Sequence, residues 1–256
     1  MSGRALIAVL ALCGGALGAI VYRADFTAAP PRAPRTALLI EAPRGTPPAR
    51  PMPVGSPSGA GLAALPASVR IQVPYTPQAP RGDWPTHEDY CEAAALLMYS
   101  HYLRGDHSAT IPAATAEREM DPLVAWERRT FDNPHPDLTL AQIGQEAGRL
   151  FGFRSVVQPA TLDAVREQLA RGNPVIIPVM THGAPGGAKL TPYYGSGNVY
   201  HVLLLIGYTA DGHLIADDGG FMQGRYWQYR WPTLWSAMEA QMPRMNQAPQ
   251  MLTLAA

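Results

Sequence analysis

From about residue 69 onward, apolar and polar positions follow patterns that predict helices first and strands afterwards. A central helix is predicted over residues 91–103, because its apolar side chains recur on one face at helical spacing. The same kind of spacing predicts helices over 138–150 and 161–170, the second followed by the helix-ending sequence Arg171-Gly172-Asn173.

Runs of alternating or continuous apolar residues predict strands over 70–75, 174–180, 200–208, 213–218 and 224–230. A short helix is expected over 232–240. Thr209-Ala-Asp-Gly212 has the composition of a hairpin turn, so the two strands beside it should pair antiparallel. Helices followed by antiparallel strands indicate an α+β fold, in which a helical half packs on a sheet half.

The N-terminal part of the chain does not share this globular pattern. An almost uninterrupted apolar run over 5–21 predicts a signal peptide or membrane anchor within residues 1–24. Residues 25–68 are dense in proline, alanine, glycine and arginine, which predicts an extended spacer and leaves 69–256 as the folded domain. We therefore expect the domain outside the cytoplasm, in the periplasm or at the cell surface, either membrane-anchored or secreted. Leu12 precedes Cys13 where a lipoprotein would need a small residue, so Cys13 is expected to be an apolar membrane residue.

Composition narrows the range of partners. The chain has 20 basic and 20 acidic residues, with Lys189 as its sole lysine, and it carries no basic run typical of nucleic-acid binding. It also lacks the glycine-rich phosphate loop that ends in Lys and Ser or Thr, so we expect no attached transporter ATPase. The expected partners are a peptide or protein substrate and, through the N-terminal segment, a membrane.

Cys91 is the candidate nucleophile, because it is the only cysteine outside the N-terminal apolar run and it opens the predicted helix. The helix macrodipole lowers the pKa of a thiol at that position, which favours the reactive thiolate. A free cysteine is also often a buried apolar side chain, which is the competing interpretation. Gln78, in a loop upstream, is positioned in the sequence to donate its amide to an oxyanion beside the backbone N–H of Cys91.

His201 is the candidate base, because it begins the most apolar strand and follows a glycine-rich loop over 181–199. If the hairpin turn places Tyr208 opposite His213, Leu204 faces Asp217 and the next aspartate shares the face of the histidine. Asp218 is therefore the expected orienting acid. A one-residue bulge in the hairpin would transfer that role to the preceding aspartate.

Several short motifs occur in a fixed order: Val73-Pro-Tyr75, Gln78, Trp84, Tyr90-Cys-Glu-Ala-Ala94, Gly172-Asn-Pro-Val-Ile-Ile177, Tyr200-His-Val202, Ile206-Gly-Tyr208 and Ile215-Ala-Asp-Asp218. Over about residues 70–240 this set resembles the stand-alone branch of the bacteriocin-processing cysteine peptidases, family thirty-nine of the cysteine peptidases. The resemblance implies a papain-like fold. It carries the roles of oxyanion donor, nucleophile, base and orienting acid onto Gln78, Cys91, His201 and Asp218.

The chain departs from that family at two points. Glu92 stands where many relatives have glycine, which places a negative charge beside the thiolate. Asp217-Asp218-Gly219 replaces the commoner Asn-Asp-Pro, which leaves the position of the acid open by one residue.

Three functions fit this constellation. The first is an extracytoplasmic thiol peptidase, and the second is a peptidase-shaped domain that binds peptides with little or no turnover, which Glu92 favours. The third is an acyl or peptidyl transferase with the same catalytic residues. A metal site built on His87, Cys91 and a distant histidine has no ligand spacing that supports it, so no cofactor is expected.

Overall fold

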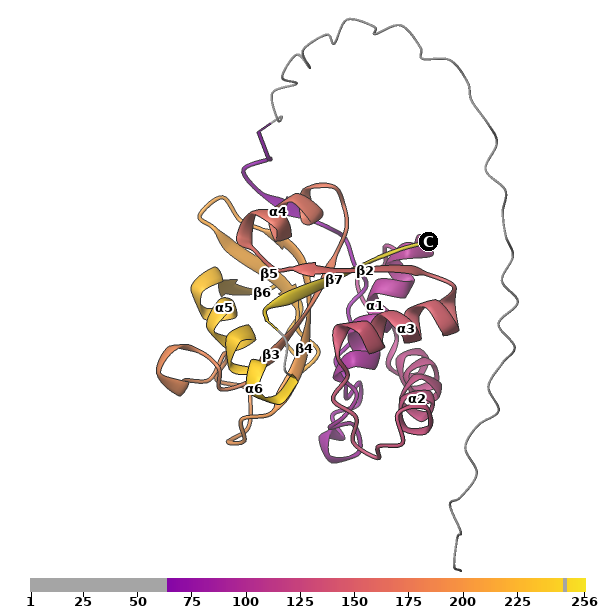
Figure 1. The fold of residues 1–256 in the computed structure, drawn as a ribbon. Coiled ribbons are helices and arrows are strands. Elements are labelled where there is room, and N and C mark those ends of the chain that lie inside the picture. The colour runs from indigo at the N-terminus through magenta and orange to yellow at the C-terminus, as the bar shows by residue number, and fades with distance from the viewer. Residues whose placement is uncertain (1–63, 246–247) are drawn as a thin grey trace, which may run out of the picture. The chain divides into compact units, whose positions relative to one another are not determined.

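The computed structural model describes residues 64–245 and 248–256, apart from the side chains of residues 244–245 (Figure 1). The predicted signal or anchor within 1–24 and most of the spacer over 25–68 lie outside the described residues. In the part of the chain that is described, no helix combines the length and the apolar character needed to cross a membrane.

The described residues form an α+β fold, as the sequence predicts. The helices are α1 (Cys91–Leu103), α2 (Ala113–Thr130), α3 (Leu140–Phe151), α4 (Leu162–Ala170), α5 (Trp231–Ala240) and α6 (Met242–Met245), with single 3-10 turns at Trp84–Thr86 and Pro185–Gly187. The strands are β1 (Val69–Arg70), β2 (Arg154–Pro159), β3 (Val175–Met180), β4 (Tyr200–Tyr208), β5 (His213–Asp217), β6 (Trp227–Arg230) and β7 (Gln250–Ala255).

All strands join one antiparallel sheet in the order β2-β7-β3-β4-β5-β6, with β1 paired to the end of β4. Strands β3 and β4 are buried along their whole length, which explains why their sequences are continuously apolar rather than alternating. Gly207 is required where β1 pairs with β4, because a Cβ atom there would lie 2.1 Å from the carbonyl oxygen of Val69. Because β4 and β5 are antiparallel, the start of β4 and the end of β5 lie at the same end of the sheet.

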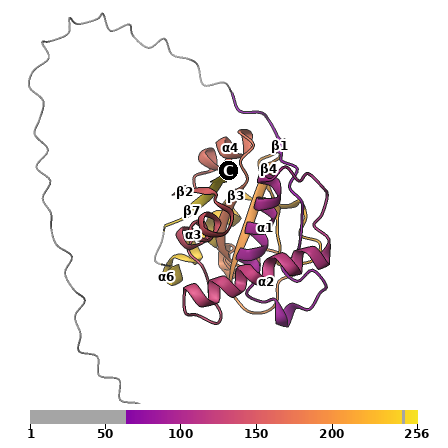
Figure 2. The same cartoon turned by 90° about the vertical axis from the view of Figure 1, so that its right-hand side faces the viewer.

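Helices α1, α2 and α3 gather on one side of the molecule, and the sheet with α5 occupies the other (Figure 1). Helix α1 is the buried centre of the helical half: it packs against β4, α2 and α3, and its first ten residues are buried. Figure 2 shows α1 alongside β4, with α2 crossing it. This packing fixes the N-terminal end of α1, and therefore Cys91, beside the start of β4.

The predicted elements agree with the structure in most places, but one predicted strand is mostly wrong and three observed elements were not predicted. The helices over 91–103, 138–150 and 161–170 are confirmed, with ends within two residues. The predicted strand over 70–75 is wrong beyond Arg70, because the chain there runs as a loop in which Tyr75 makes an isolated bridge to Thr110. The prediction also lacked α2, β2 and β7, so the strict order of helices first and strands afterwards is incorrect.

Candidate active site

Cys91 is the first residue of α1, and its thiol is buried, with 6% of the residue exposed. The sulfur donates a hydrogen bond to Oε2 of Glu92 at 2.9 Å. The backbone N–H of Val202, in β4, also interacts with the sulfur. The thiol therefore lies beside the residue that follows His201, while its proton is directed to Glu92.

The pKa of the Cys91 thiol differs from the one that the sequence suggests. Burial raises the pKa of Cys91 well above its usual value, and the charge of Glu92 and the hydrogen bond to it raise this pKa further. The Val202 amide lowers the pKa but does not offset those three causes. The expectation that the helix macrodipole leaves Cys91 with a depressed pKa is therefore wrong for this state, in which the thiol is neutral.

Glu92 is itself part of the buried site, with 1% of the residue exposed. Its Oε1 accepts a hydrogen bond from the backbone N–H of Leu138 at 2.9 Å, and its Oε2 accepts the one from Cys91. Burial raises the pKa of Glu92 to about 7, although both hydrogen bonds act in the opposite direction. The carboxyl group is thus held against the thiol from the helical side of the site.

Two further glutamates are buried behind Glu92, one on each neighbouring helix. Glu127 lies on α2 and Glu146 on α3, and both are fully buried. Burial, with the charges of the neighbouring carboxyl groups, raises the pKa of Glu127 to about 11 and that of Glu146 to about 8. The helical half therefore carries an acidic cluster in its interior that holds protons at neutral pH.

His201 and Asp218 form the best-defined pair of the site. Nε2 of His201 lies 2.8 Å from Oδ1 of Asp218, and both residues are buried. Because Nε2 faces the aspartate, Nδ1 is the ring nitrogen left to exchange a proton with a reacting group. A carboxylate that holds one nitrogen of an imidazole fixes both the ring and its tautomer, which is what a catalytic base requires.

Three groups besides His201 donate hydrogen bonds to the carboxylate of Asp218. The hydroxyls of Tyr194 and Tyr229 donate to Oδ2 at 2.6 Å and 2.5 Å, and the backbone N–H of Gly220 donates to Oδ1 at 2.9 Å. Burial by itself would raise the pKa of Asp218, but the charge of His201 and the hydrogen bonds from His201, Tyr194 and Tyr229 outweigh it and lower the pKa. Asp218 is therefore an ionised carboxylate despite its complete burial.

Asp217 points away from this network. Its Oδ1 accepts the backbone N–H of Tyr226 at 3.1 Å, and burial raises its pKa to about 7. The side chain is buried on the other side of the strand, as alternation along β5 requires. Of the two adjacent aspartates, only Asp218 contacts the histidine.

The hairpin that positions these aspartates contains two irregularities that compensate for each other. The predicted turn pairs Tyr208 with His213, but Tyr208 pairs with Leu214. A bulge farther along β4 shifts the register by one residue, so that Leu204 faces Asp217 as predicted. The face of each aspartate therefore agrees with the prediction although the predicted turn register is wrong.

Gln78 lies at the wall of the site, but its amide group is already engaged. Nε2 donates to the carbonyl oxygens of His87 and Glu88 at 2.8 Å and 3.1 Å. Both amide hydrogens are thus directed at the loop that precedes α1, and neither points at an oxyanion. The role of Gln78 as an oxyanion donor stays a prediction.

A cleft of about 750 Å³ opens beside His201. Gln78 lines it from the helical side, and Tyr194 and Gly220 line it from the sheet side. Gly220 has to be glycine here, because a Cβ atom would lie 2.6 Å from the ring of Tyr194 and 3.0 Å from Nε2 of His201. The cleft therefore gives a ligand access to the histidine without disturbing its aspartate.

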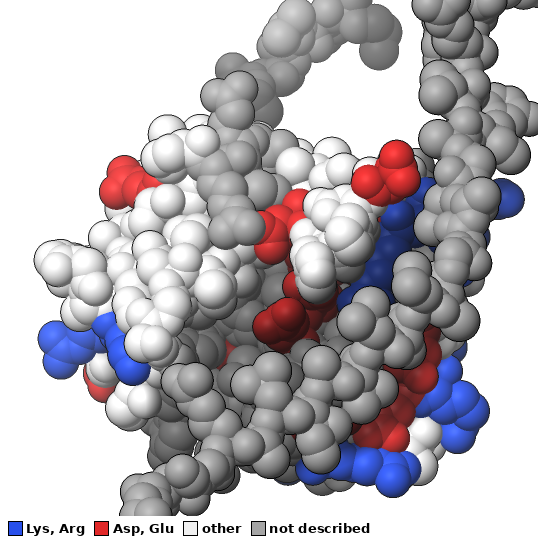
Figure 3. All heavy atoms as spheres, turned by 90° about the horizontal axis from the view of Figure 1, so that it is seen from below, with Lys and Arg blue, Asp and Glu red and all other residues white. Residues whose placement is uncertain are grey.

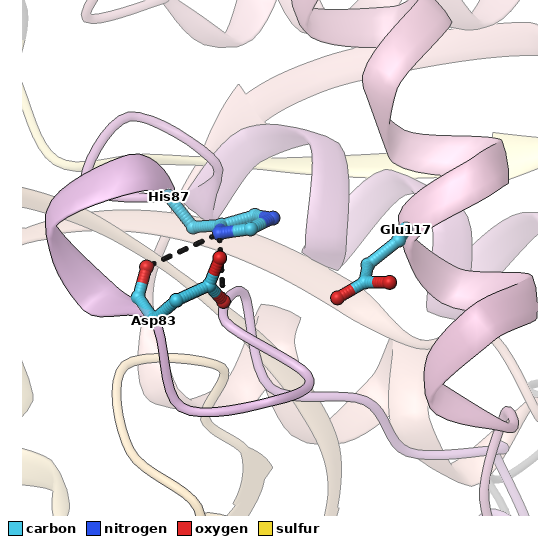
Figure 4. A group of neighbouring side chains, drawn as sticks. All are labelled: Asp83, His87 and Glu117. Carbon is cyan, nitrogen blue, oxygen red and sulfur yellow. Dashed lines mark hydrogen bonds and ion pairs between the residues drawn. The ribbon is translucent and has the colours of Figure 1, made fainter.

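A group that could hold a cation lies next to this site, but it does not include Cys91. Asp83, His87 and Glu117 offer ligand atoms that lie within 4.8 Å of one another (Figure 4). Nδ1 of His87 faces Asp83, at 3.1 Å from Oδ1, and the other ring nitrogen is turned toward Glu117. Arg81 lies 2.8 Å from Glu117 and already balances that carboxylate. This group does not support a metal shared with the thiol.

The sequence analysis did not identify three residues of the site. Tyr194 comes from the glycine-rich loop, Tyr229 from β6, and Gly220 from the turn after the aspartates. Their contacts with Asp218 depend on how the sheet and the loop meet. No local pattern in the sequence marks the two tyrosines, whereas the consecutive glycines after Asp218 indicate a close approach of the backbone.

Comparison with known proteins gives one family and two solved structures. The family model described as "Peptidase C39 like family" matches residues 70–245. A C39-like peptidase from Bacillus anthracis has 17% sequence identity and a TM-score of 0.48, over 74% of this chain and 98% of that chain. Xylellain, a cysteine protease from Xylella fastidiosa, has 14% identity and a TM-score of 0.43, over 79% of this chain and 90% of that chain. No curated protein matches the chain.

Proposed function

Because the chain belongs to the Peptidase C39 like family, we propose that it is an extracytoplasmic thiol peptidase that hydrolyses peptide bonds with Cys91 as its nucleophile. The observation that carries the proposal is the buried His201–Asp218 pair, with a 2.8 Å contact, at a cleft that His201 lines. Cys91, which begins α1, interacts with the backbone N–H of Val202, the residue after this histidine. A nucleophile, an oriented base and an open cleft are the parts that acyl transfer requires.

In the first step, the thiol proton leaves its hydrogen bond to Glu92 and passes to Nδ1 of His201, and the Cys91 sulfur attacks the carbonyl carbon of the substrate. The negative charge moves onto the carbonyl oxygen. We assign its stabilisation to the backbone N–H of Cys91 and to one amide hydrogen of Gln78, which exchanges its 3.1 Å bond to the Glu88 carbonyl for the oxyanion.

In the second step, the imidazolium of His201 returns its proton to the leaving amine as the C–N bond breaks, and a thioester remains on Cys91. Water then attacks the thioester and gives a proton to His201. The carboxylate product leaves, and the thiol is restored. Asp218 stays ionised throughout, because its role is to hold the ring and to stabilise the imidazolium.

A reactive-thiol experiment tests the proposal. The full chain in a Cys13→Ala background has Cys91 as its sole thiol, so labelling by a peptide-like electrophile reports on that residue alone. We expect stoichiometric labelling that is lost in Cys91→Ala and slowed strongly in His201→Ala. Labelling that is equally fast without the histidine would show an ordinary thiol and would argue against the proposal.

One observation favours a second candidate, a peptide-binding domain without turnover. The thiol proton is bonded to Glu92, and the buried carboxyl group opposes formation of the thiolate. Under this alternative, peptides bind to the cleft with equal affinity in wild type and Cys91→Ala, and no product appears in either protein. The transferase alternative uses the same residues, and an amine replaces water in the last step.

We extend the proposal to the location of the domain. The apolar run over 5–21 and the proline-rich spacer support an anchored domain held away from a membrane. The full chain expressed in bacteria should pellet with membranes, resist extraction by high salt, and release its domain when an external protease cuts the spacer. A wholly soluble protein with its N-terminus trimmed near Gly18 would show a cleaved signal peptide instead.

A further inference from the structure

The wall of the cleft that belongs to the helical half is acidic. Glu88 and Asp89, from the loop before α1, and Asp137, from the loop before α3, all line the cleft. Among the described residues that line it there is no lysine or arginine. Seen from below, acidic side chains occur near the middle of the molecule, with basic side chains beside them and along the edges (Figure 3). The chain as a whole has no net charge, so this negative charge is local.

The three acids differ in how far their charge is balanced by the protein. Asp89 is balanced, because Oδ2 lies 3.4 Å from Arg128 and 2.5 Å from His135. Among the described residues, Glu88 forms no ion pair within 4.0 Å and its side chain is exposed, and its carboxylate lies within 4.8 Å of His135 and Asp89. Burial is the largest cause of the raised pKa of Cys91 and of Glu92, and the charge of Asp137 is a smaller cause that raises both. The charge of Asp137 therefore acts on the thiol as well as on the cleft that it lines.

The opposite wall is apolar and only partly covered. Tyr193, Val199 and Met222 line the cleft and keep 53%, 53% and 44% of their surface exposed. Tyr193 is stacked on Phe221, with ring centroids 4.8 Å apart, so this wall is a built surface rather than a set of isolated side chains. Large exposed apolar side chains beside a cleft commonly contact a ligand.

We propose that the cleft selects peptides with a lysine or arginine side chain close to the cleaved bond, which the Glu88–Asp137 wall binds while an apolar side chain of the same peptide packs on Tyr193. This inference rests on the proposed peptidase function and names its substrate class. An acidic side chain at the same position would be repelled by the wall, so selectivity comes from attraction and repulsion together. Because the wall is partly exposed to solvent, the preference should weaken as salt is added.

The test uses the full-length protein and three sets of quenched fluorescent peptides that are identical except for one varied position, occupied by Lys, Gln or Glu. The varied position is moved along the peptide to cover both sides of the cleaved bond. At the best position, we expect kcat/KM for Lys to exceed that for Gln by about tenfold and the Glu peptide to be the poorest, which is the size expected of a few partly exposed charge pairs. In Glu88→Gln the Lys-to-Gln ratio should fall about threefold. The matched control, Glu239→Gln, changes an exposed glutamate on α5 outside the cleft and should leave the ratio unchanged.

The outcomes separate this inference from the proposed function. Cleavage with equal kcat/KM for the Lys and Gln peptides would overturn the substrate class and leave the peptidase function standing. If the protein does not hydrolyse peptides, the inference is tested by binding. The affinity of each peptide for Cys91→Ala is then measured by fluorescence anisotropy. Tighter binding of the Lys peptide, reduced by Glu88→Gln, would support the acidic wall even if hydrolysis is not found, and equal binding of all three peptides would refute it.

Discussion

Glu92→Gln is the most informative perturbation of the site, because Glu92 is the group that holds the thiol proton. Glutamine keeps the shape of the side chain, and its oxygen still accepts the Leu138 N–H that Glu92 Oε1 accepts at 2.9 Å. The amide nitrogen replaces Oε2, which accepts the thiol hydrogen bond at 2.9 Å. The substitution therefore removes a negative charge from beside the sulfur and adds a donor that favours the thiolate.

The magnitude follows from the distance between the two charges. At a separation of roughly 4 Å and an effective dielectric constant of about 20, two like charges repel by about 4 kcal/mol. Since about 1.4 kcal/mol corresponds to one pH unit, the midpoint of thiol ionisation should fall by on the order of three pH units. Burial, the first cause of the raised pKa of Cys91, is unchanged by the substitution.

The assay is the rate of alkylation of the full chain by iodoacetamide between pH 4 and pH 11 (about the range over which a thiol ionises), in the Cys13→Ala background. Glu239→Gln is the matched control, because it neutralises an exposed carboxylate on α5 that lies outside the cleft and does not contact the sulfur. An alkylation midpoint for Glu92→Gln that is within about half a unit of the parent, or above it, would show that the carboxylate does not control the thiol.

Three further predictions concern stability and the other site residues. The raised pKa values of Glu127, about 11, and of the neighbouring buried glutamates mean that the folded domain binds more protons than the unfolded chain above about pH 4.5, so urea titrations should show stability falling from pH 5 to pH 8. Glu127→Gln should raise the free energy of unfolding at pH 8 by on the order of 2 kcal/mol, and destabilisation there would contradict the assignment. Asp218→Asn should lower kcat by about 10³ or more because His201 loses its partner, whereas Asp217→Asn should have a small effect on kcat; the reverse order would move the orienting role. Gln78→Ala should lower kcat by about 10² with little change in KM, and a change in KM alone would make Gln78 a residue that holds the loop or the substrate.

The elements that the sequence predicts well are those whose buried positions follow a regular helical or strand pattern. Residues 91–103 and 200–208 pack against each other in the centre of the domain, and their ends coincide with the predicted ones. Helix α2 escaped prediction because only one narrow stripe of it is buried and because Pro122 interrupts its sequence. Strands β2 and β7 pair with each other across almost one hundred residues of sequence, and β2 is largely exposed, so neither carries a strong local pattern.

In the site, too, the sequence predicts the features that depend on local patterns and misses the contacts between distant parts of the chain. The helix start at Cys91 and the strand start at His201 are local features, and both are placed as expected. The hydroxyl of Tyr194 reaches Asp218 only through the folding of a long loop, which no local pattern describes. Glu92 was noticed as a departure from glycine, but only the structure shows that its side chain turns back to the thiol.

Hydrolysis in water enriched in oxygen-18 tests most directly whether Cys91 forms a thioester that water resolves. The full chain is incubated with a peptide mixture of varied sequence, and the products are read by mass spectrometry. The account predicts new peptides whose C-terminal carboxylate carries one heavy oxygen, and it predicts that these products disappear in Cys91→Ala. Products that persist in the alanine variant, or joined peptides without the heavy oxygen, would contradict it.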